Sequence, residues 1–553
     1  DVFTATSGEF QAGVKALSDG YRAGHPEARY DLRDVIQACV AIDVGNVAAG
    51  FARRASRLLG EDGSPVAIIK ELKAALRHYA SVNPDDLDRT PPRTVLGLLM
   101  RAIGRSPGMG CTGFSVAPAL CGGTHGLHAR TFDGAFFDWN NVPGLHLVDE
   151  RDPARPAIRH RYAAVGTAGL VYPGGISGIN EAGLAFSLHQ MSTVSYTRGT
   201  PGGGWEIAPF VMQRMLRECT TLGEAIALAE SVCHFASWTI LASDARNGQS
   251  VRIEINGHGG ARAPKPEVSA IDIAPWLAQS NHFLAASMRE RFDFFGDAHF
   301  TKTPGKWLET RARKRTVEQE LTPILANGSL DMTKALALLA SHDDAALDGA
   351  FRSFGRTIVK AYGIMASIAR APAAGGTAEL WFTLGDRLPG PHSAMVGFAV
   401  DWEHFALSPL AGGTLRAATP PDQLDALSAY IDAHRAQLRP RGEDGRYLGR
   451  EPTAAEEKAI AATVLGHLDR AIEKAENTHG EVEAPMRYIR ARVAFEADDL
   501  TRARRDIERL RALATGNVSR HTLIAYERAL ILTLCAALEK AEGHDDKAKA
   551  DAT

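Results

Sequence analysis

The chain is poor in cysteine for its length. Six cysteines stand among 553 residues, and no two of them have the C-x-x-C spacing of a zinc ligand pair. Six thiols spread over so long a chain also do not form the dense framework of a small disulfide-linked protein. We therefore expect no structural metal and no disulfide scaffold, and the sequence indicates no cofactor.

Net charge and long apolar runs are also scarce. The formal charge is −3, which provides no basic field for nucleic acid. Short arginine-rich stretches such as residues 311–315 are interpreted as a solvated helix face. No apolar run approaches the roughly 18 residues of a membrane span. We expect a soluble protein, with a slight preference for export because the chain begins with Asp1, although removal of a tag would leave the same N-terminus.

The chain is too long for one compact core, and its texture changes twice. Residues 1–110 are predicted to be mostly helical, with apolar residues at helical spacing in segments 31–59, 64–79 and 94–103. Residues 111–410 show short strands, Gly turns and interspersed helices. Residues 411–553 are rich in helix formers and are predicted to form a helical accessory domain. Binding a protein partner is one possible function of this domain.

The middle region contains the patterns of two sheets. Strands are predicted at 161–171, 178–190, 238–243 and 251–255, and a second group at 363–369, 379–384 and 394–400. Asn247-Gly248 is a hairpin signal between two of these strands. Helices are predicted at 207–218 and 221–232. Strands in clusters with helices between them favour two stacked sheets covered by helices, an α+β fold.

One short stretch combines residues that suit a cysteine nucleophile. Cys111 follows Gly110, and Arg130 and Asp133 come one predicted hairpin later. A nearby arginine favours the reactive thiolate. If the Gly110–Cys111 bond is cut, the freed α-amine titrates near 8, close to working pH, and can act as a general base. Cys111 could instead be a buried structural thiol, and Arg130 and Asp133 could form a surface ion pair. Asp138 is a competing candidate for the carboxylate.

Four blocks in order resemble the cysteine N-terminal nucleophile (Ntn) hydrolases of the choloylglycine hydrolase and isopenicillin N acyltransferase group, which includes acyl-CoA:6-aminopenicillanic acid acyltransferase-like proteins. The resemblance covers about residues 105–405. The blocks are Cys111-Thr112, Arg130-Thr131-Phe132-Asp133, the stretch Gly-Ile-Asn-Glu-Ala-Gly-Leu-Ala at 178–185, and Ser280-Asn281-His282.

The resemblance implies a fold and a chemistry. The fold would be an αββα sandwich at 111–410, preceded by a helical pro-segment or small chain at 1–110. The chain would cleave itself between Gly110 and Cys111 and remain a heterodimer of its two parts. Cys111 would then attack a small-molecule linear amide, or use a thioester acyl donor. Asp133 would orient the α-amine, and Arg130 would hold the thiolate or the region of the substrate carbonyl.

The resemblance also implies an oxyanion hole. Asn281 is the candidate side-chain donor, since a neutral amide stabilises a developing negative charge. The second donor would be a backbone N–H at the end of the Asn180 block, at His189 or, with one residue gapped, at Gln190. Another interpretation of Asn281 is a turn residue before His282.

Two further hypotheses stay open at this stage. One is a non-catalytic binding protein in which an Ntn scaffold serves the C-terminal helices. The other is a papain-like hydrolase that pairs Cys111 with His282 and an orienting Asn281 or Asn247, although the C-G-S-C-W segment of that class is absent. The sequence does not specify the substrate, or whether water or an amine takes the acyl group.

Overall fold

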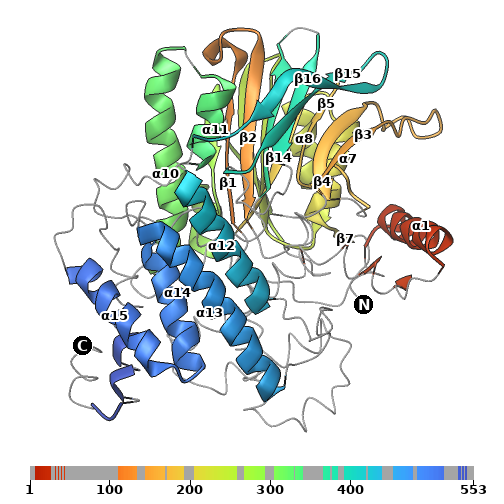
Figure 1. The fold of residues 1–553 in the computed structure, drawn as a ribbon. Helices are drawn as coiled ribbons and strands as arrows, with labels where there is room; N and C mark the ends of the chain where they lie inside the picture. Colours follow the sequence, from red (N-terminus) through yellow and green to blue (C-terminus); the bar gives the residue numbers. More distant parts are fainter. Residues whose placement is uncertain are drawn as a thin grey trace.

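The structure is a computed structural model (Figure 1). Its described residues are 6–26, 31, 32, 35, 36, 39, 43, 110–133, 143–167, 171–191, 205–257, 267–292, 304–328, 330–340, 365–373, 376–383, 392–418, 421–438, 453–476, 483–515, 534–536, 538–540 and 542–544. The predicted helices at 64–79 and 94–103 lie outside this part of the chain. No helix among the described residues is both long and apolar enough to cross a membrane.

Two seven-stranded antiparallel sheets form the centre of the molecule. The first has the order β12-β1-β2-β13-β14-β15-β16. Its strands are Trp276–Gln279, Gly110–Val116, His125–Asp133, Met365–Pro372, Ala378–Thr383, Met395–Asp401 and Ala406–Leu415. The short 3-10 helix η2 (Pro118–Leu120) and a turn with left-handed Gly122 and Gly123 connect β1 to β2.

The second sheet has the order β11-β10-β9-β6-β5-β4-β3. Its strands are Glu267–Ala274, Gln249–Asn256, Trp238–Asp244, Leu184–Gln190, Ser177–Asn180, Tyr162–Thr167 and Pro143–Val148. A separate parallel pair is formed by β7 (Trp205–Glu206) and β8 (Cys233–His234). Side chains of β2 reach β6 and β9, so the two sheets contact each other across their inner faces.

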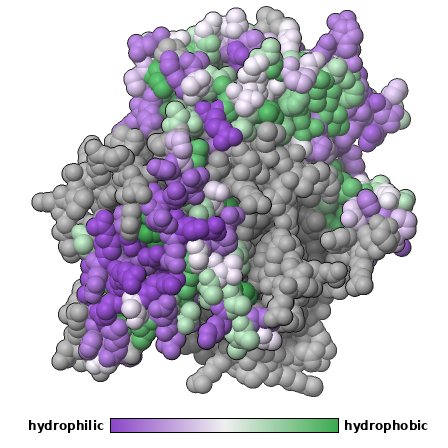
Figure 2. All heavy atoms as spheres, viewed as in Figure 1, coloured by the Kyte–Doolittle hydropathy of each residue, from purple (hydrophilic) through white to green (hydrophobic). Residues whose placement is uncertain are grey.

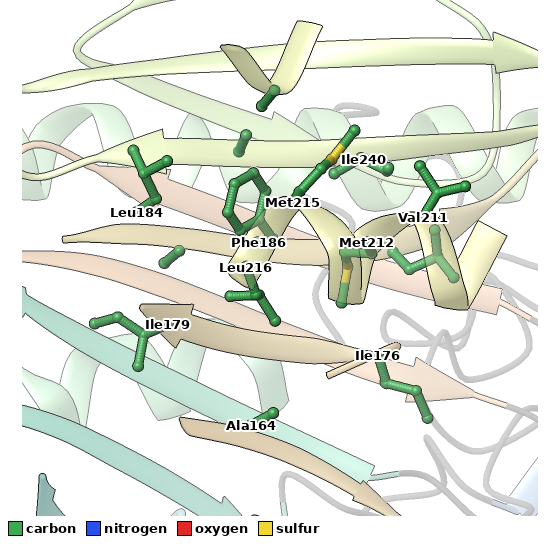
Figure 3. Packing of buried hydrophobic residues seen from close by; sticks show 14 of the residues in the cluster. Ala164, Ile176, Ile179, Leu184, Phe186, Val211, Met212, Met215, Leu216 and Ile240 are labelled. Carbon is green, nitrogen blue, oxygen red and sulfur yellow. The ribbon is translucent and has the colours of Figure 1, made fainter. Parts of the chain in front are cut away.

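Helices pack against the outer face of each sheet. Helices α7 (Ala208–Glu218) and α8 (Leu222–Ser231) share one hydrophobic cluster with the second sheet. Figure 3 shows side chains of α7 among those of β5 and β6. Helices α10 (Pro304–Ala326) and α11 (Met332–Ala340) share another cluster with the first sheet. The short α9 (Ala286–Phe292) follows β12. Each apolar helix stripe is thus buried against one sheet face.

The N-terminal helix α1 (Gly8–Gly24) packs against the region around α7. Its Phe10 lies edge-to-face on Phe210, with ring centroids 5.6 Å apart, and both belong to a small apolar cluster that includes Cys39. Glu9 forms an ion pair with Arg217 of α7 at 2.8 Å. The segment before Cys111 is therefore tied to the body that follows it.

The C-terminal helices form a separate hydrophobic cluster. They are α12 (Pro421–Leu438), α13 (Ala454–Glu476), α14 (Glu483–Glu496) and α15 (Leu500–Thr515). Helices α14 and α15 are consecutive, and Asp498 between them adopts a left-handed φ of 63°. Figure 2 shows mostly hydrophilic residues on the visible face of α13–α15. These helices therefore have an apolar cluster of their own and a mostly hydrophilic visible face.

The strand predictions were right in position but wrong in one connection. The predicted strand 178–190 is two strands, β5 and β6, joined by a turn in which Gly183 has a φ of 83°. The first part of segment 161–171 forms β4, and Asn247-Gly248 lies in the predicted β9–β10 hairpin. Strands β3, β7, β8, β11, β12 and β16 were missed.

Candidate active site

Cys111 is the second residue of β1, and its side chain is fully buried. Strand β1 pairs with β2 in a register that places Gly113 opposite Arg130. From there the Arg130 guanidinium donates a hydrogen bond from Nη2 to the Cys111 sulfur at 3.0 Å. A cation at this distance stabilises a thiolate relative to the thiol. The predicted pair of Cys111 and Arg130 is thus in direct contact.

Arg130 is fixed from several sides. Its Nη1 donates to the Ile176 carbonyl at 2.8 Å, and its Nε donates to the Thr131 carbonyl at 3.3 Å. The guanidinium carbon also lies 5.1 Å from the centre of the Phe132 ring. A buried arginine held in this way keeps its charge and its orientation, because carbonyl oxygens and a ring face replace the lost hydration.

Asn281 contacts the nitrogen of the same cysteine. Its Oδ1 accepts a hydrogen bond from the Cys111 N–H at 2.8 Å, and its Nδ2 donates to the Gln190 carbonyl at 2.7 Å. The loop after β12 carries Asn281, and the Thr310 hydroxyl of α10 accepts the Asn281 N–H at 2.8 Å. The Asn281 amide therefore connects β1 of the first sheet to the end of β6 in the second.

Arg313 is a site residue that the sequence interpretation missed. The helix-face interpretation of 311–315 is wrong for Arg313, which is 3% exposed. Its Nη1 donates to the Cys111 carbonyl and the Thr112 hydroxyl at 2.5 and 2.7 Å, and its Nη2 donates to Asn281 Oδ1 at 2.7 Å. The available signal was spacing, since buried residues of α10 recur at helical intervals on one face: Thr310, Arg313, Val317 and Leu321.

Asp133 lies at the end of β2, where the register pairs it with Gly110. The backbone of Asp133 thus lies beside Gly110, next to the Gly110–Cys111 bond. The Asp133 side chain is outside the described part of the chain, as is the competing Asp138. The assignment of Asp133 as the residue that orients the amine remains a prediction.

His189 lies on the inner face of β6, fully buried, with its ring against Gly113 of β1. A Cβ on Gly113 would lie 2.8 Å from the His189 Cε1, so only glycine leaves room for this ring. Burial, and then the positive charge of Arg130, lower the pKa of His189 well below its usual range. The imidazole is therefore neutral at physiological pH.

His282 has other partners than the papain-like hypothesis requires. Its Nδ1 lies 3.1 Å from the Ser280 hydroxyl and 3.1 Å from the Thr310 hydroxyl. Burial, with nearby lysine and arginine charges, lowers its pKa well below the usual range. These contacts give His282 a role in holding the loop around Asn281. Asn247 lies in the β9–β10 turn, where its side chain donates to Asp244.

The other thiols lie in different surroundings. Burial raises the pKa of Cys121 to about 11 and that of Cys219 to about 12, which keeps both sulfurs protonated. Cys233 is exposed on β8. The Cys111 sulfur, by contrast, accepts a hydrogen bond from Arg130.

One cluster of potential metal ligands occurs among the described residues, at Glu539, Glu542 and His544 near the C-terminus. The Arg504 guanidinium forms ion pairs with both carboxylates. An arginine already neutralises the charge that a divalent ion would need, so this cluster is an ion-pair network between α15 and the terminal residues.

Part of the chain matches a known family. Residues 122–312 match the family model described as Acyl-coenzyme A:6-aminopenicillanic acid acyl-transferase. The predicted family resemblance is confirmed. The match includes Arg130, Asp133 and Asn281, and it begins after Cys111. A search of curated proteins found no relative.

Solved structures similar to the chain include hydrolases and an acylase. Two are variants of the conjugated bile acid hydrolase of Clostridium perfringens. One is 11% identical with a TM-score of 0.30, covering 54% of this chain and 96% of the other. The second is 12% identical with a TM-score of 0.33, covering 56% and 99%. Penicillin V acylase of Agrobacterium tumefaciens is 12% identical with a TM-score of 0.29, covering 56% and 99%.

Proposed function

We propose that the chain is a cysteine Ntn hydrolase with an αββα catalytic region, and that it transfers the acyl group of a linear amide or thioester through Cys111. The observation that carries the proposal is the double contact at one residue. Arg130 donates to the sulfur of Cys111, and Asn281 accepts from its nitrogen. Different side chains thus hold the sulfur and the nitrogen of Cys111. This arrangement suits a residue whose sulfur is the nucleophile and whose nitrogen becomes the general base.

The first reaction would be self-cleavage. The Cys111 sulfur attacks the Gly110 carbonyl carbon, and the C–N bond then breaks to give a thioester and a free α-amine. Water releases the thioester. The Asn281 oxygen already accepts from the nitrogen that becomes this amine, so the amine is oriented from the moment it forms. It then serves as the general base when Cys111 attacks an external carbonyl, and water or an amine resolves the acyl-enzyme.

The backbone favours Gln190 over His189 as the second oxyanion donor. The Met191 N–H donates to the carbonyl of Ser237, just before β9, at 3.3 Å. In an antiparallel ladder N–H groups alternate in direction, so the His189 N–H points toward β9 and its register partner Thr239. The Gln190 N–H points the opposite way, as does that of Leu188, which donates to Ile176 at 3.1 Å. We propose that the oxyanion hole combines this backbone donor with the Asn281 amide.

Retention of residues 1–110 after cleavage would make the product a heterodimer. Asp43 supports this, because its carboxylate accepts from the Trp238 indole at 2.6 Å and from the Ala208 N–H, at the start of α7, at 2.8 Å. Tyr172 donates to the Cys39 carbonyl at 2.8 Å. Buried polar contacts of this kind keep two segments together after the connecting bond is cut.

We further propose that residues 411–553 act as an accessory domain that binds a protein partner or restricts the substrate. Their hydrophobic cluster is their own. Arg487 and Arg490 of α14 share Asp506 of α15 in buried ion pairs, which fix the pairing of these two helices. A rigid helical unit with a hydrophilic exterior suits docking.

The test is acyl transfer by the purified protein. Suitable probes are phenoxymethylpenicillin, a glycine-conjugated bile acid, and an acyl-CoA with an added amine acceptor. The wild type should release amine or free CoA from at least one probe class, and Cys111→Ala should release none. Cys121→Ala removes a thiol from the next turn and serves as the matched control, with activity near wild type. Equal activity of Cys111→Ala and wild type would refute the proposed nucleophile.

A further inference from the structure

A continuous chain of hydrogen-bonding side chains crosses the contact between the two sheets. The His128 ring of β2 lies between two serines of the second sheet, with Nδ1 2.9 Å from the Ser243 hydroxyl and Nε2 2.8 Å from the Ser187 hydroxyl. The Ser187 hydroxyl also lies 3.0 Å from His189 Nε2. His128, Ser187 and His189 are buried, whereas Ser243 at the far end is half-buried.

The two ends of this hydrogen-bonded series have different surroundings. At one end, Ser243 and His128 line a small cavity together with Asp244 and Gln249. At the other end, the Cε1–Nε2 edge of the His189 ring faces Gly113, which is two residues from Cys111 and on the same face of β1. The remaining ring nitrogen of His189, Nδ1, is buried and has no hydrogen-bond partner among the described residues.

The contacts couple the tautomers of the two histidines. A neutral imidazole has one N–H donor and one acceptor nitrogen, and a hydroxyl donates only one hydrogen. If Ser187 donates to His189 Nε2, then His189 carries its hydrogen on Nδ1. If Ser187 donates to His128 instead, then His189 Nδ1 is an acceptor. If every hydrogen bond in this series exchanges its donor and acceptor, one proton is therefore moved from the His189 end to the Ser243 end.

Self-cleavage needs a base to take the Cys111 thiol proton, and these hydrogen-bonded side chains can supply one. The α-amine is the base only after the Gly110–Cys111 bond is broken, because in the intact chain the Cys111 nitrogen is an amide. Building on the proposed function, we propose that the chain Ser243–His128–Ser187–His189 is a proton relay that takes the proton of the Cys111 thiol before cleavage. Arg130 then holds the resulting thiolate.

The step balances as a shift of one proton. The sulfur gives its proton to His189 Nδ1, directly or through one water, while Nε2–H passes its own to Ser187. Ser187 protonates His128 Nε2, His128 Nδ1–H protonates Ser243, and Ser243 gives its proton to water in the cavity. The sulfur forms its bond to the Gly110 carbon. When the C–N bond breaks, its electron pair stays on nitrogen, and a proton returns along the relay to complete the amine.

Electrostatics favour a concerted transfer. Burial, and then the charge of Arg130, lower the pKa of His128 to about 3 and that of His189 well below its usual range. Arg313 adds to the positive field at His189. An imidazolium is therefore unfavourable at either histidine. Each ring must release one proton as it accepts another, which is what exchange between neutral tautomers accomplishes.

The experiment compares self-cleavage of full-length variants made by cell-free synthesis. The readout is the rate at which a fragment beginning at Cys111 accumulates in H₂O and in D₂O. We expect His189→Gln to slow cleavage by at least about 100-fold, the usual contribution of a general base. Ser187→Ala keeps His189 but disconnects it from His128, so it should be slower than wild type with a smaller solvent isotope effect. Ser115→Ala is the matched control, since its buried hydroxyl has no hydrogen-bond partner among the described residues, and it should match wild type.

Cleavage of His189→Gln at the wild-type rate would overturn the relay. So would Ser187→Ala and Ser115→Ala variants with equal rates and equal isotope effects, and this pair decides the matter if His189→Gln does not fold. A wild-type chain that is never cut would refute the proposed self-cleavage instead. In that case the rate of Cys111 alkylation by iodoacetamide tests the relay alone. A slower reaction in His189→Gln supports the relay, and equal rates overturn it.

Discussion

Replacing Asp43 by asparagine should change how the stability of the protein depends on pH. Asp43 is fully buried, and burial raises its pKa from about 3.8 to about 7 in spite of its bonds to Ala208 and Trp238. A carboxyl whose folded-state pKa is raised contributes stability below its unfolded-state pKa. It loses that contribution as pH rises through the folded-state value. The shift of roughly three units corresponds to about 4 kcal/mol, at about 1.4 kcal/mol per unit.

The assay is urea unfolding of wild type and Asp43→Asn between pH 4 and pH 8. Asparagine does not titrate, so the wild-type free energy of unfolding minus that of the variant should fall by up to about 4 kcal/mol as pH rises. The variant also loses one of two acceptors, a cost of about 1–3 kcal/mol at every pH. Asp19→Asn on the exposed face of α1 is the control, with no comparable trend. A difference that stays constant, or grows with pH, would refute the reasoning.

Three further outcomes are expected. Asn281→Ala should lower kcat by about 100- to 1000-fold and change KM much less, because its amide acts on charge that develops in the transition state; kcat near wild type would remove Asn281 from the site. Arg313→Met should lower the melting temperature and slow self-cleavage, since Cys111, Thr112 and Asn281 each lose a charged donor; unchanged values in both assays would contradict the site geometry. A chain ending at Gly412 should keep a reactive Cys111 but lose solubility, partner binding or substrate restriction; unchanged handling of substrate would contradict the accessory role.

Local patterns predicted most of the framework. Turn glycines and alternating residues located β9, β10, β13, β14 and β15 closely, because each strand is bounded by loop residues and has a strong apolar face. The strand β11 was missed because none of its residues is buried, so it has no strongly apolar face. The turn at Gly183 was missed because the apolar pattern continues on both sides of it.

The sequence predicted the site residues that stand in local motifs, and it missed those that only packing brings together. Cys111, Arg130 and Asn281 were found because each stands in a short block with a recognisable order of residues. Arg313 contacts Cys111 across 202 positions of sequence, through the packing of α10 on the first sheet. The contact of His189 with Gly113 likewise depends on the stacking of two sheets, which no local pattern specifies.

The central claim is that Cys111 cuts the chain before it and then acts as the N-terminal nucleophile. The mass of the purified wild-type and Cys111→Ala proteins tests this claim most directly. We expect a wild-type fragment that begins at Cys111 with an unblocked α-amine, and a single uncut polypeptide for Cys111→Ala. A Cys111→Ala chain cut after Gly110, or a wild-type chain that stays intact, would contradict it.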